Sequence, residues 1–171
     1  MAAGSVRLEA LVLFSHGSLL CGAGETLQWH ARRLKERGEF AIVEVGFMNY
    51  SEPTFVEAVE KCAKGGASHV TVVPYFLVPG KFVSVDLPKH VDRARARWPN
   101  LEFHVAQPIG FDEALADALI ELADDARGRD HWRDDFVRAS DFCESDPQCP
   151  LYGTPPCPRM PSAPDRVQVV S

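Results

Sequence analysis

A histidine between two hydroxyl side chains follows the first apolar run of the chain. Leu11 to Phe14 is apolar, and the chain continues as Ser-His-Gly-Ser over residues 15–18. A neutral imidazole can ligate a metal or accept a proton near neutral pH. Gly17 removes a side chain beside the ring of His16, so a ligand could approach it closely. Loop residues held by a rigid strand carry function more often than core residues do, which makes His16 the first candidate functional residue.

A second group of chemically capable residues lies near the end of the chain. Cys143, Cys149 and Cys157 fall within fifteen residues, and proline follows the last two. Thiolates select iron–sulfur clusters or zinc, and a cluster usually takes four ligands. Cys21, Cys62 or a second subunit could supply the fourth, although Cys62 is expected to pack as a small hydrophobe. We predict an iron–sulfur cluster on the three tail cysteines and Cys21, with zinc or incidental thiols as alternatives.

The remaining pattern predicts the elements that hold these residues. Apolar and alternating runs predict strands at 8–14, 40–47, 69–76 and 101–106. Helical periodicity predicts helices at 24–37, 51–64, 86–98 and 111–125, and a loop over 77–85. This βαβαβαβα order predicts an α/β fold: a four-stranded parallel sheet with helices on both faces, flavodoxin-like. Residues 1–127 form that domain, and residues 128–171 form an irregular, proline-rich, cysteine-containing C-terminal tail.

The loops that follow parallel strands meet at one edge of the sheet, where such folds bind ligands. These loops are 15–24, 48–53, 74–86 and 107–112. Besides His16, they offer side chains for substrate contacts or proton transfer: Ser18, Cys21, Asn49, Tyr50, Glu52, Tyr75, Lys81, Ser84 and Asp86. Glu52 and Asp86 could instead only cap helices, and Lys81 could simply be solvated.

Composition narrows the class of protein. The chain has 171 residues and a net charge of −6, with no basic run, which argues against nucleic acid as a partner. No apolar stretch approaches the ~20 residues that span a membrane, and the N-terminus lacks the apolar region of a secretory signal. We therefore expect a cytoplasmic protein that contacts neither membrane nor nucleic acid.

Several motifs occur together in one order. They are Leu-Phe-Ser-His-Gly-Ser at 13–18, Val-Gly-Phe-Met-Asn-Tyr-Ser-Glu-Pro-Thr at 45–54, Val-Val-Pro-Tyr-Phe-Leu-Val-Pro-Gly at 72–80, Asp-Leu-Pro at 86–88 and Gln-Pro-Ile-Gly at 107–110. In these stretches the chain resembles the short, single-domain sirohydrochlorin chelatases of the class II chelatase superfamily. The resemblance covers roughly residues 8–125.

The resemblance implies insertion of a divalent metal, cobalt or iron, into sirohydrochlorin or a related tetrapyrrole, as in the formation of siroheme or cobalamin. His16 matches the first metal-binding histidine of the family and would be both metal ligand and proton acceptor. Two positions depart from the family pattern. Phe82 stands where the family usually has a second histidine, and Asn49 stands where it often has a glutamate.

Glu52, Asp86 or His90 could replace the missing ligands, and Glu52 is the candidate second catalytic residue. Ser18, Asn49, Tyr75 and Lys81 are the candidate substrate-binding residues. Lys81, Lys89 and Arg93 could form a basic patch for the carboxylates of a tetrapyrrole. Backbone N–H groups near residues 22–25 could bind one further carboxylate of the tetrapyrrole.

We therefore predict a metal chelatase, a lyase of tetrapyrrole biosynthesis. Short family members resemble half of the two-domain chelatases, which implies a homodimer. The alternative is a carrier or regulator that binds metal, tetrapyrrole or an iron–sulfur cluster without inserting metal. A flavodoxin-like phosphate binder is a weaker third reading, because the first loop lacks a phosphate-cradling pattern.

Overall fold

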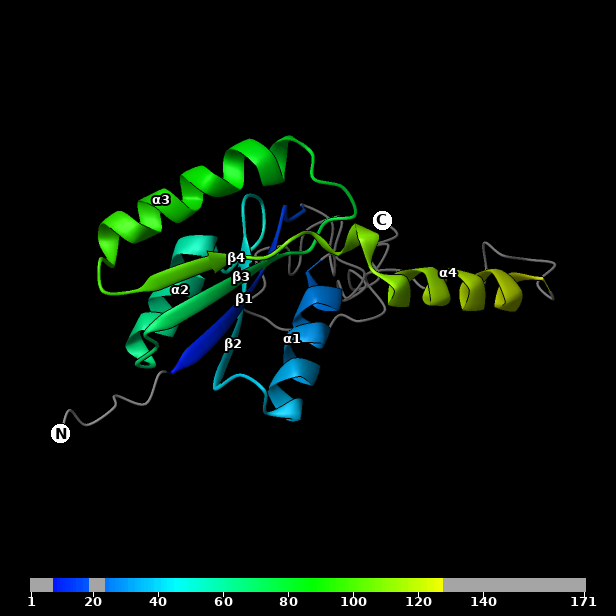
Figure 1. Ribbon diagram of the computed structural model, residues 1–171, viewed down its shortest axis with the longest axis horizontal. Coiled ribbons are helices and arrows are strands. Elements are labelled where there is room, and N and C mark those ends of the chain that lie inside the picture. The colour runs from blue at the N-terminus through cyan, green and yellow to red at the C-terminus, as the bar shows by residue number, and fades with distance from the viewer. Residues whose placement is uncertain (1–7, 19–23, 128–171) are drawn as a thin grey trace, which may run out of the picture.

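A single parallel sheet forms the centre of the molecule (Figure 1). The structure, a computed structural model, describes residues 8–18 and 24–127. The four strands lie in the order β2-β1-β3-β4, and every neighbouring pair is parallel. Their bounds are β1 (Glu9–Ser15), β2 (Ile42–Phe47), β3 (His69–Pro74) and β4 (Glu102–Val105). The predicted four-stranded parallel sheet is confirmed.

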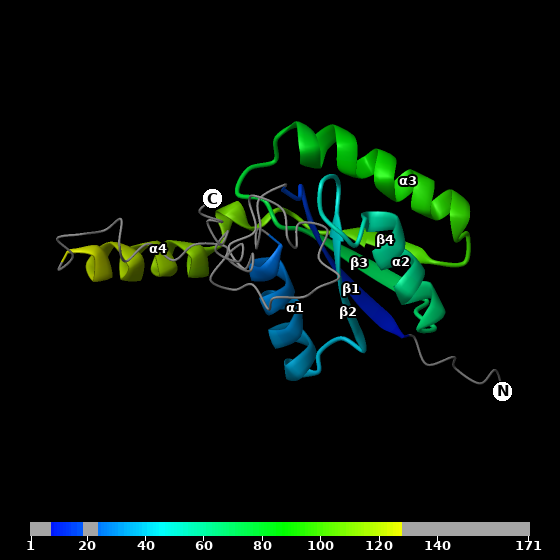
Figure 2. The ribbon, with the colours of Figure 1, turned by 180° about the vertical axis from the view of Figure 1, so that it is seen from behind.

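Helices connect the strands and cover both faces of the sheet, as Figures 1 and 2 show from opposite sides. The α-helices are α1 (Glu25–Arg37), α2 (Phe55–Lys64), α3 (Leu87–Arg97) and α4 (Glu113–Ala126). Two short helical turns, η1 (Phe82–Asp86) and η2 (Ile109–Phe111), precede α3 and α4. No helix among the described residues is both long and apolar enough to span a membrane.

The core has two halves because successive side chains of a strand point to opposite faces. On one face, Ala10, Val12 and Phe14 of β1 pack with buried residues of α2 and α3. On the other face, Leu11 and Leu13 pack with buried residues of α1 and β2. β1 is thus covered on both sides, which holds the segment after it rigidly.

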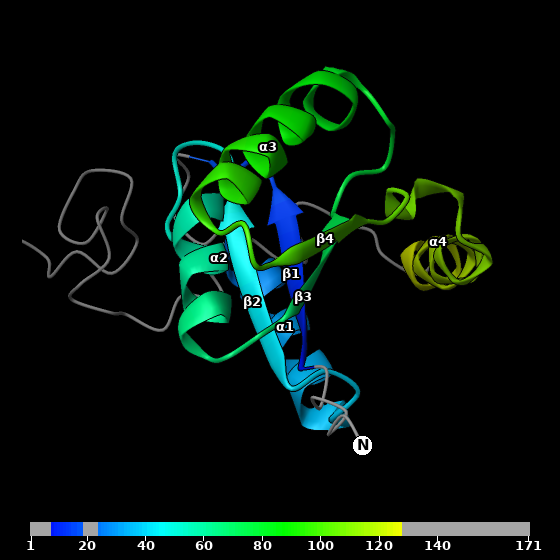
Figure 3. The ribbon, with the colours of Figure 1, turned by 60° about the vertical axis from the view of Figure 1, so that its left-hand side comes forward.

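The fourth helix stands apart from this core. In Figures 1 and 3, α4 extends away from the sheet instead of lying on it. None of its described side chains is buried, and Leu119, Ile120 and Leu122 are 60–66% exposed. Within the described part of the chain, the face of β3 and β4 beside α1 is therefore only partly covered.

Two of the predicted boundaries are wrong. The expected loop over 77–85 contains the π-helical turn η1, which runs directly into α3. The second helix begins at Phe55, after the N-cap Thr54, so Pro53 lies outside it rather than in its first turn. Thr54 and Glu57 form a reciprocal capping box, which satisfies two backbone N–H groups at the helix start.

Candidate functional site

The segment after β1 is held by backbone hydrogen bonds to the loop after β2. The backbone N–H of Met48 donates to the carbonyl of Ser15, and that of Asn49 donates to the carbonyl of His16, both at 2.9 Å. Farther along, the Ser51 hydroxyl accepts from the N–H of Ser18 at 2.9 Å and donates to its carbonyl at 3.1 Å. Residues 15–18, the described start of the first predicted ligand loop, therefore form one hydrogen-bonded unit with the second loop.

Gly17 makes this close approach possible. Its φ of +86° lies in the left-handed region, where residues with a Cβ are strained. A Cβ built on Gly17 would overlap the carbonyl oxygen of Asn49. Only glycine fits here, because the β2–α2 loop passes directly over the backbone of residue 17.

The imidazole of His16 is oriented by its own neighbour. Nδ1 lies 3.1 Å from the carbonyl oxygen of Gly17. A carbonyl only accepts, so Nδ1 carries the proton in this hydrogen bond, and Nε2 of the neutral ring keeps its lone pair. This tautomer suits a metal ligand or a proton acceptor, because a backbone partner on one ring nitrogen fixes the ring while the other reacts.

Two aromatic rings flank His16. The centroid of Phe82 lies 4.4 Å from that of the imidazole, and the centroid of Tyr50 lies 5.8 Å away. Phe82 is 39% exposed and Tyr50 is 64% exposed, so both present ring surface to solvent beside the imidazole. Phe82 is anchored through Phe76, which contacts the core residue Phe14. The arrangement is an apolar, aromatic surface surrounding a single imidazole.

The structure brings some predicted site residues to His16 and places others elsewhere. Asn49 contributes backbone groups to the His16 loop, and exposed Lys81 directly precedes Phe82. Glu52 is exposed on the β2–α2 loop. Tyr75 lies on the opposite face of the sheet, where its hydroxyl is 3.3 Å from Nε2 of His30 on α1. Tyr75 is therefore not part of the cluster around His16.

The candidate substitutes Asp86, at the end of η1, and His90, on α3, have other partners. Asp86 pairs with Lys89 at 3.3 Å, and its side chain makes no cap hydrogen bond at the start of α3. His90 is half-buried, with its ring 6.0 Å from Phe14 and 6.1 Å from Phe55. Burial lowers the pKa of His90, and nearby Arg93 lowers it further against the opposing effect of Asp86. His90 thus packs on the core beside Phe14 and Phe55.

The four cysteines of the predicted cluster fall outside the part of the chain that the structure describes. They are Cys21, Cys143, Cys149 and Cys157. Cys62 is fully buried, and burial raises the pKa of its thiol to about 12. It packs as the small hydrophobe that we expected and is no thiolate ligand.

Within residues 8–18 and 24–127, no group of three or more His, Cys, Asp and Glu side chains could hold a metal ion. His16 is accordingly a one-imidazole centre in the described structure. Such a centre holds a metal only when other donors, from water or a bound molecule, complete the coordination sphere. The contacts of His16 with two aromatic rings were not predicted from the sequence, although Tyr50 and Phe82 both lie in predicted ligand loops.

Comparison with protein families and curated relatives gives consistent matches. The model of the CbiX family matches residues 10–126. A sirohydrochlorin cobaltochelatase of Methanopyrus kandleri is 33% identical over 144 residues, which cover 72% of this chain and 100% of that protein. A sirohydrochlorin cobaltochelatase of Methanocaldococcus jannaschii is 46% identical over 82 residues, which cover 48% of this chain and 57% of that protein.

Solved structures show the same fold. A CbiX protein from Marinobacter aquaeolei aligns with a TM-score of 0.60 and 26% identity, over 68% of this chain and 95% of that one. The sirohydrochlorin chelatase SirB from Bacillus subtilis, in complex with cobalt, aligns with a TM-score of 0.65 and 29% identity, over 68% of this chain. The alignment spans 50% of the SirB chain.

Proposed function

Because the chain belongs to the CbiX family, we propose that it is a metal chelatase that inserts divalent cobalt or iron into sirohydrochlorin or a related tetrapyrrole. Three of the proteins named above, those of Methanopyrus kandleri, Methanocaldococcus jannaschii and Bacillus subtilis, are named sirohydrochlorin chelatases. The observation that carries the proposal is His16 at the ligand edge of the sheet, whose ring lies near those of Tyr50 and Phe82 and whose Nδ1 is bonded to the Gly17 carbonyl. The direct test is to follow sirohydrochlorin absorbance after adding Co²⁺ or Fe²⁺ to the purified protein.

In the proposed reaction the metal replaces two pyrrole protons, and two protons leave. His16 binds the incoming metal through Nε2 and later accepts a proton from the macrocycle. Its hydrogen bond to Gly17 engages Nδ1 and leaves Nε2 as the acceptor nitrogen. Tyr50 and Phe82 pack against the flat, apolar part of the macrocycle, as aromatic rings do with other π-systems.

Polar residues around the aromatic surface take supporting parts in the proposal. Glu52, exposed on the loop beside His16, carries protons away to solvent. Lys81, exposed next to Phe82, pairs with a substrate carboxylate. Asn49 and Ser18 hold the site together mainly through their backbone. Tyr75 contacts His30 on the face of the sheet opposite His16, which supports a structural role for it rather than substrate binding.

Phe82→His should strengthen binding of Co²⁺ in the absence of tetrapyrrole by about 10-fold or more. The ring of residue 82 lies 4.4 Å from the His16 ring, so an imidazole there would give the ion a second nitrogen ligand. Isothermal titration calorimetry with CoCl₂ measures the dissociation constant, and the visible absorption of Co²⁺ reports the change in coordination.

Phe82→Leu is the matched control, because it keeps an apolar side chain and adds no ligand. Its affinity for Co²⁺ should stay at the wild-type value. Equal affinities in the histidine and leucine variants would mean that His16 does not hold the metal beside residue 82.

A carrier that binds metal or tetrapyrrole without turnover is the second candidate function. The presence of Phe82 in place of a second ligand favours it, since a single imidazole holds a metal weakly. A carrier would shift the tetrapyrrole spectrum on binding but would not produce the metallated product at a rate above the uncatalysed one.

The tail is proposed to hold an iron–sulfur cluster on Cys143, Cys149 and Cys157, with Cys21 as fourth ligand. The spacing of the cysteines and the proline after Cys149 and Cys157 support this proposal. Protein purified without oxygen should contain iron and acid-labile sulfide in about equal amounts, and Cys149→Ser should remove both. A colourless wild-type protein without sulfide would leave zinc or free thiols.

Two further parts of the proposal concern organisation. Residues 1–127 form the chelatase domain and residues 128–171 an extension. The chain matches 50% of the length of SirB, so a homodimer would supply the second half of such a molecule. The composition supports a cytoplasmic protein.

A further inference from the structure

Tyr50, on the loop after β2, has a backbone conformation that tyrosine rarely adopts. Its φ is +62°, and it is the only described residue other than glycine with a positive φ. Across it, the N–H of Ser51 donates to the carbonyl of Asn49 at 2.7 Å. A hydrogen bond of this kind, between residues two apart around a positive φ, makes a strained γ-turn. Such strain persists only where surrounding contacts impose it, and it is concentrated at ligand sites.

Ser51 supplies one of the contacts that impose this turn. Its hydroxyl accepts from the N–H of Ser18 at 2.9 Å and donates to the Ser18 carbonyl at 3.1 Å. One side chain therefore holds both backbone groups of a residue 33 positions away in the chain. On the other side of the turn, the carbonyl of Asn49 lies directly against Gly17. Tyr50 thus lies between two contacts with the His16 loop, and relaxing its φ would disturb one of them.

The strained turn places the Tyr50 ring beside His16 and leaves it exposed. The two ring centroids are 5.8 Å apart, with an angle of 59° between the ring planes. Tyr50 is 64% exposed, so burial of its ring within the described chain does not account for its conformation. A ring that is already in place before a ligand arrives loses little freedom on binding, which strengthens binding. The turn therefore suits ligand contact better than it suits stability of the fold.

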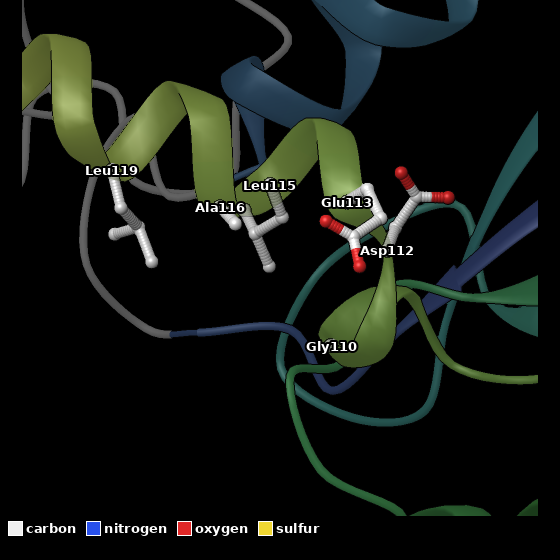
Figure 4. Close-up of a pocket in the computed structure, with 6 residues that line it drawn as sticks. All are labelled: Gly110, Asp112, Glu113, Leu115, Ala116 and Leu119. Carbon is white, nitrogen blue, oxygen red and sulfur yellow. The ribbon is translucent and has the colours of Figure 1, made fainter.

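The third and fourth ligand loops also meet at a glycine. Gly110 lies so close to the backbone of Leu77 that a Cβ on residue 110 would overlap the Leu77 carbonyl. The hollow beside this contact is lined by Gly110, Asp112, Glu113, Leu115, Ala116 and Leu119 (Figure 4). None of these lining residues is aromatic, and the two carboxylates would repel the carboxylates of a tetrapyrrole. A flat, anionic ligand therefore fits the surface beside His16 and Tyr50 better than it fits this hollow.

We propose that Ser51 is a positioning residue: its hydroxyl holds Tyr50 in the strained turn, so that the phenol ring stands beside the His16 imidazole before a tetrapyrrole binds. Tyr50 then contacts the macrocycle while His16 takes the metal. Ser51 touches neither the macrocycle nor the metal and acts only through Tyr50 and the Ser18 backbone. This role rests on the proposed function, because the Tyr50 ring needs a flat ligand to contact.

The first test titrates metal-free sirohydrochlorin into the full chain and follows its absorbance, so that binding is measured without metal insertion. Tyr50→Gly should raise the Kd about 10-fold or more, because the ring is lost. The thermal midpoint of this variant should equal or exceed that of wild type, because glycine adopts a positive φ without strain. Tyr50→Phe keeps the ring and should keep the wild-type Kd.

The second test removes the support and leaves the ring. Ser51→Ala should raise the Kd about 3- to 10-fold, and Ser51→Thr, which restores a hydroxyl, should recover most of that loss. Ser68→Ala is the matched control and should keep the wild-type Kd. Ser68 is also half-buried, and its hydroxyl donates to the backbone carbonyl of Leu8, but it lies beside the amino-terminal end of β3.

Three results would overturn the role of Ser51. They are a wild-type Kd in Tyr50→Gly or Ser51→Ala, a thermal midpoint of Tyr50→Gly well below wild type, and an equal loss of binding in Ser68→Ala and Ser51→Ala. The proposed activity fails differently: a wild type that binds sirohydrochlorin without inserting metal would reject the chelatase and leave the role of Ser51 intact. A wild type that binds neither sirohydrochlorin nor a related tetrapyrrole would reject both.

Discussion

His16→Ala is expected to lower the rate of metal insertion by at least about 100-fold while the protein stays folded. His16 is the only described imidazole at this edge that contacts both Tyr50 and Phe82. Its loss would remove both the nitrogen that receives the metal and the group that accepts a pyrrole proton. Initial rates with sirohydrochlorin and Co²⁺ measure the effect, and thermal unfolding checks the fold.

The matched control is His69→Gln, which removes a histidine at the amino-terminal end of β3, opposite the His16 edge. Its insertion rate should equal that of wild type. If His16→Ala retained the wild-type rate, the site assigned to His16 would be wrong. If neither wild type nor variant inserted metal, the carrier would replace the chelatase as the proposed function.

Gly17→Ala should lower the free energy of unfolding by about 2–4 kcal/mol and abolish insertion. Alanine is strained at a φ of +86°, and its Cβ would displace the Asn49 carbonyl and break the contact between the two loops. Urea unfolding followed by circular dichroism gives the free energy, and the insertion assay gives the loss of function.

Substitutions at two other glycines distinguish the cost of backbone strain from the cost of steric overlap. Gly38 also has a positive φ, +74°, but a Cβ there meets nothing within 4 Å, so Gly38→Ala should cost only about 1 kcal/mol. Gly80 has neither constraint, and Gly80→Ala should change stability by less than about 0.5 kcal/mol. A cost at Gly17 no larger than at Gly38 would mean that the loops separate without penalty.

The sequence was sufficient for the fold where a whole run of residues is apolar. The run over residues 11–14 predicts a buried strand, and β1 has buried side chains on both faces. Lateral strand order could not be predicted, because periodicity carries no information on which strand lies beside which. The turn η1 was missed because Pro79 and Gly80 are typical of a loop. In the structure, Phe82 contacts Phe76 and His16, and the N–H groups of Val83 and Ser84 donate to the Gly80 carbonyl.

The site was only partly predictable for a related reason. His16 could be selected because a loop motif follows directly from a rigid strand. Tyr75 was grouped with it because both lie in ligand loops, yet strand alternation puts Tyr75 on the same face as Val73, toward α1. That alternation can be read from the sequence. The position of α4 cannot, because a periodic pattern predicts an amphipathic helix but not the surface against which the helix packs.

The burial of Cys62 has a practical consequence for chemical labelling. A thiol with a pKa of about 12 and no solvent access does not react with maleimide or iodoacetamide in the native protein. The chain has five cysteines, so every thiol labelled before unfolding belongs to the other four. Counting labelled thiols in native and unfolded protein would therefore report on the four cysteines of the proposed cluster, Cys21 and the three of the tail, with Cys62 as an internal reference.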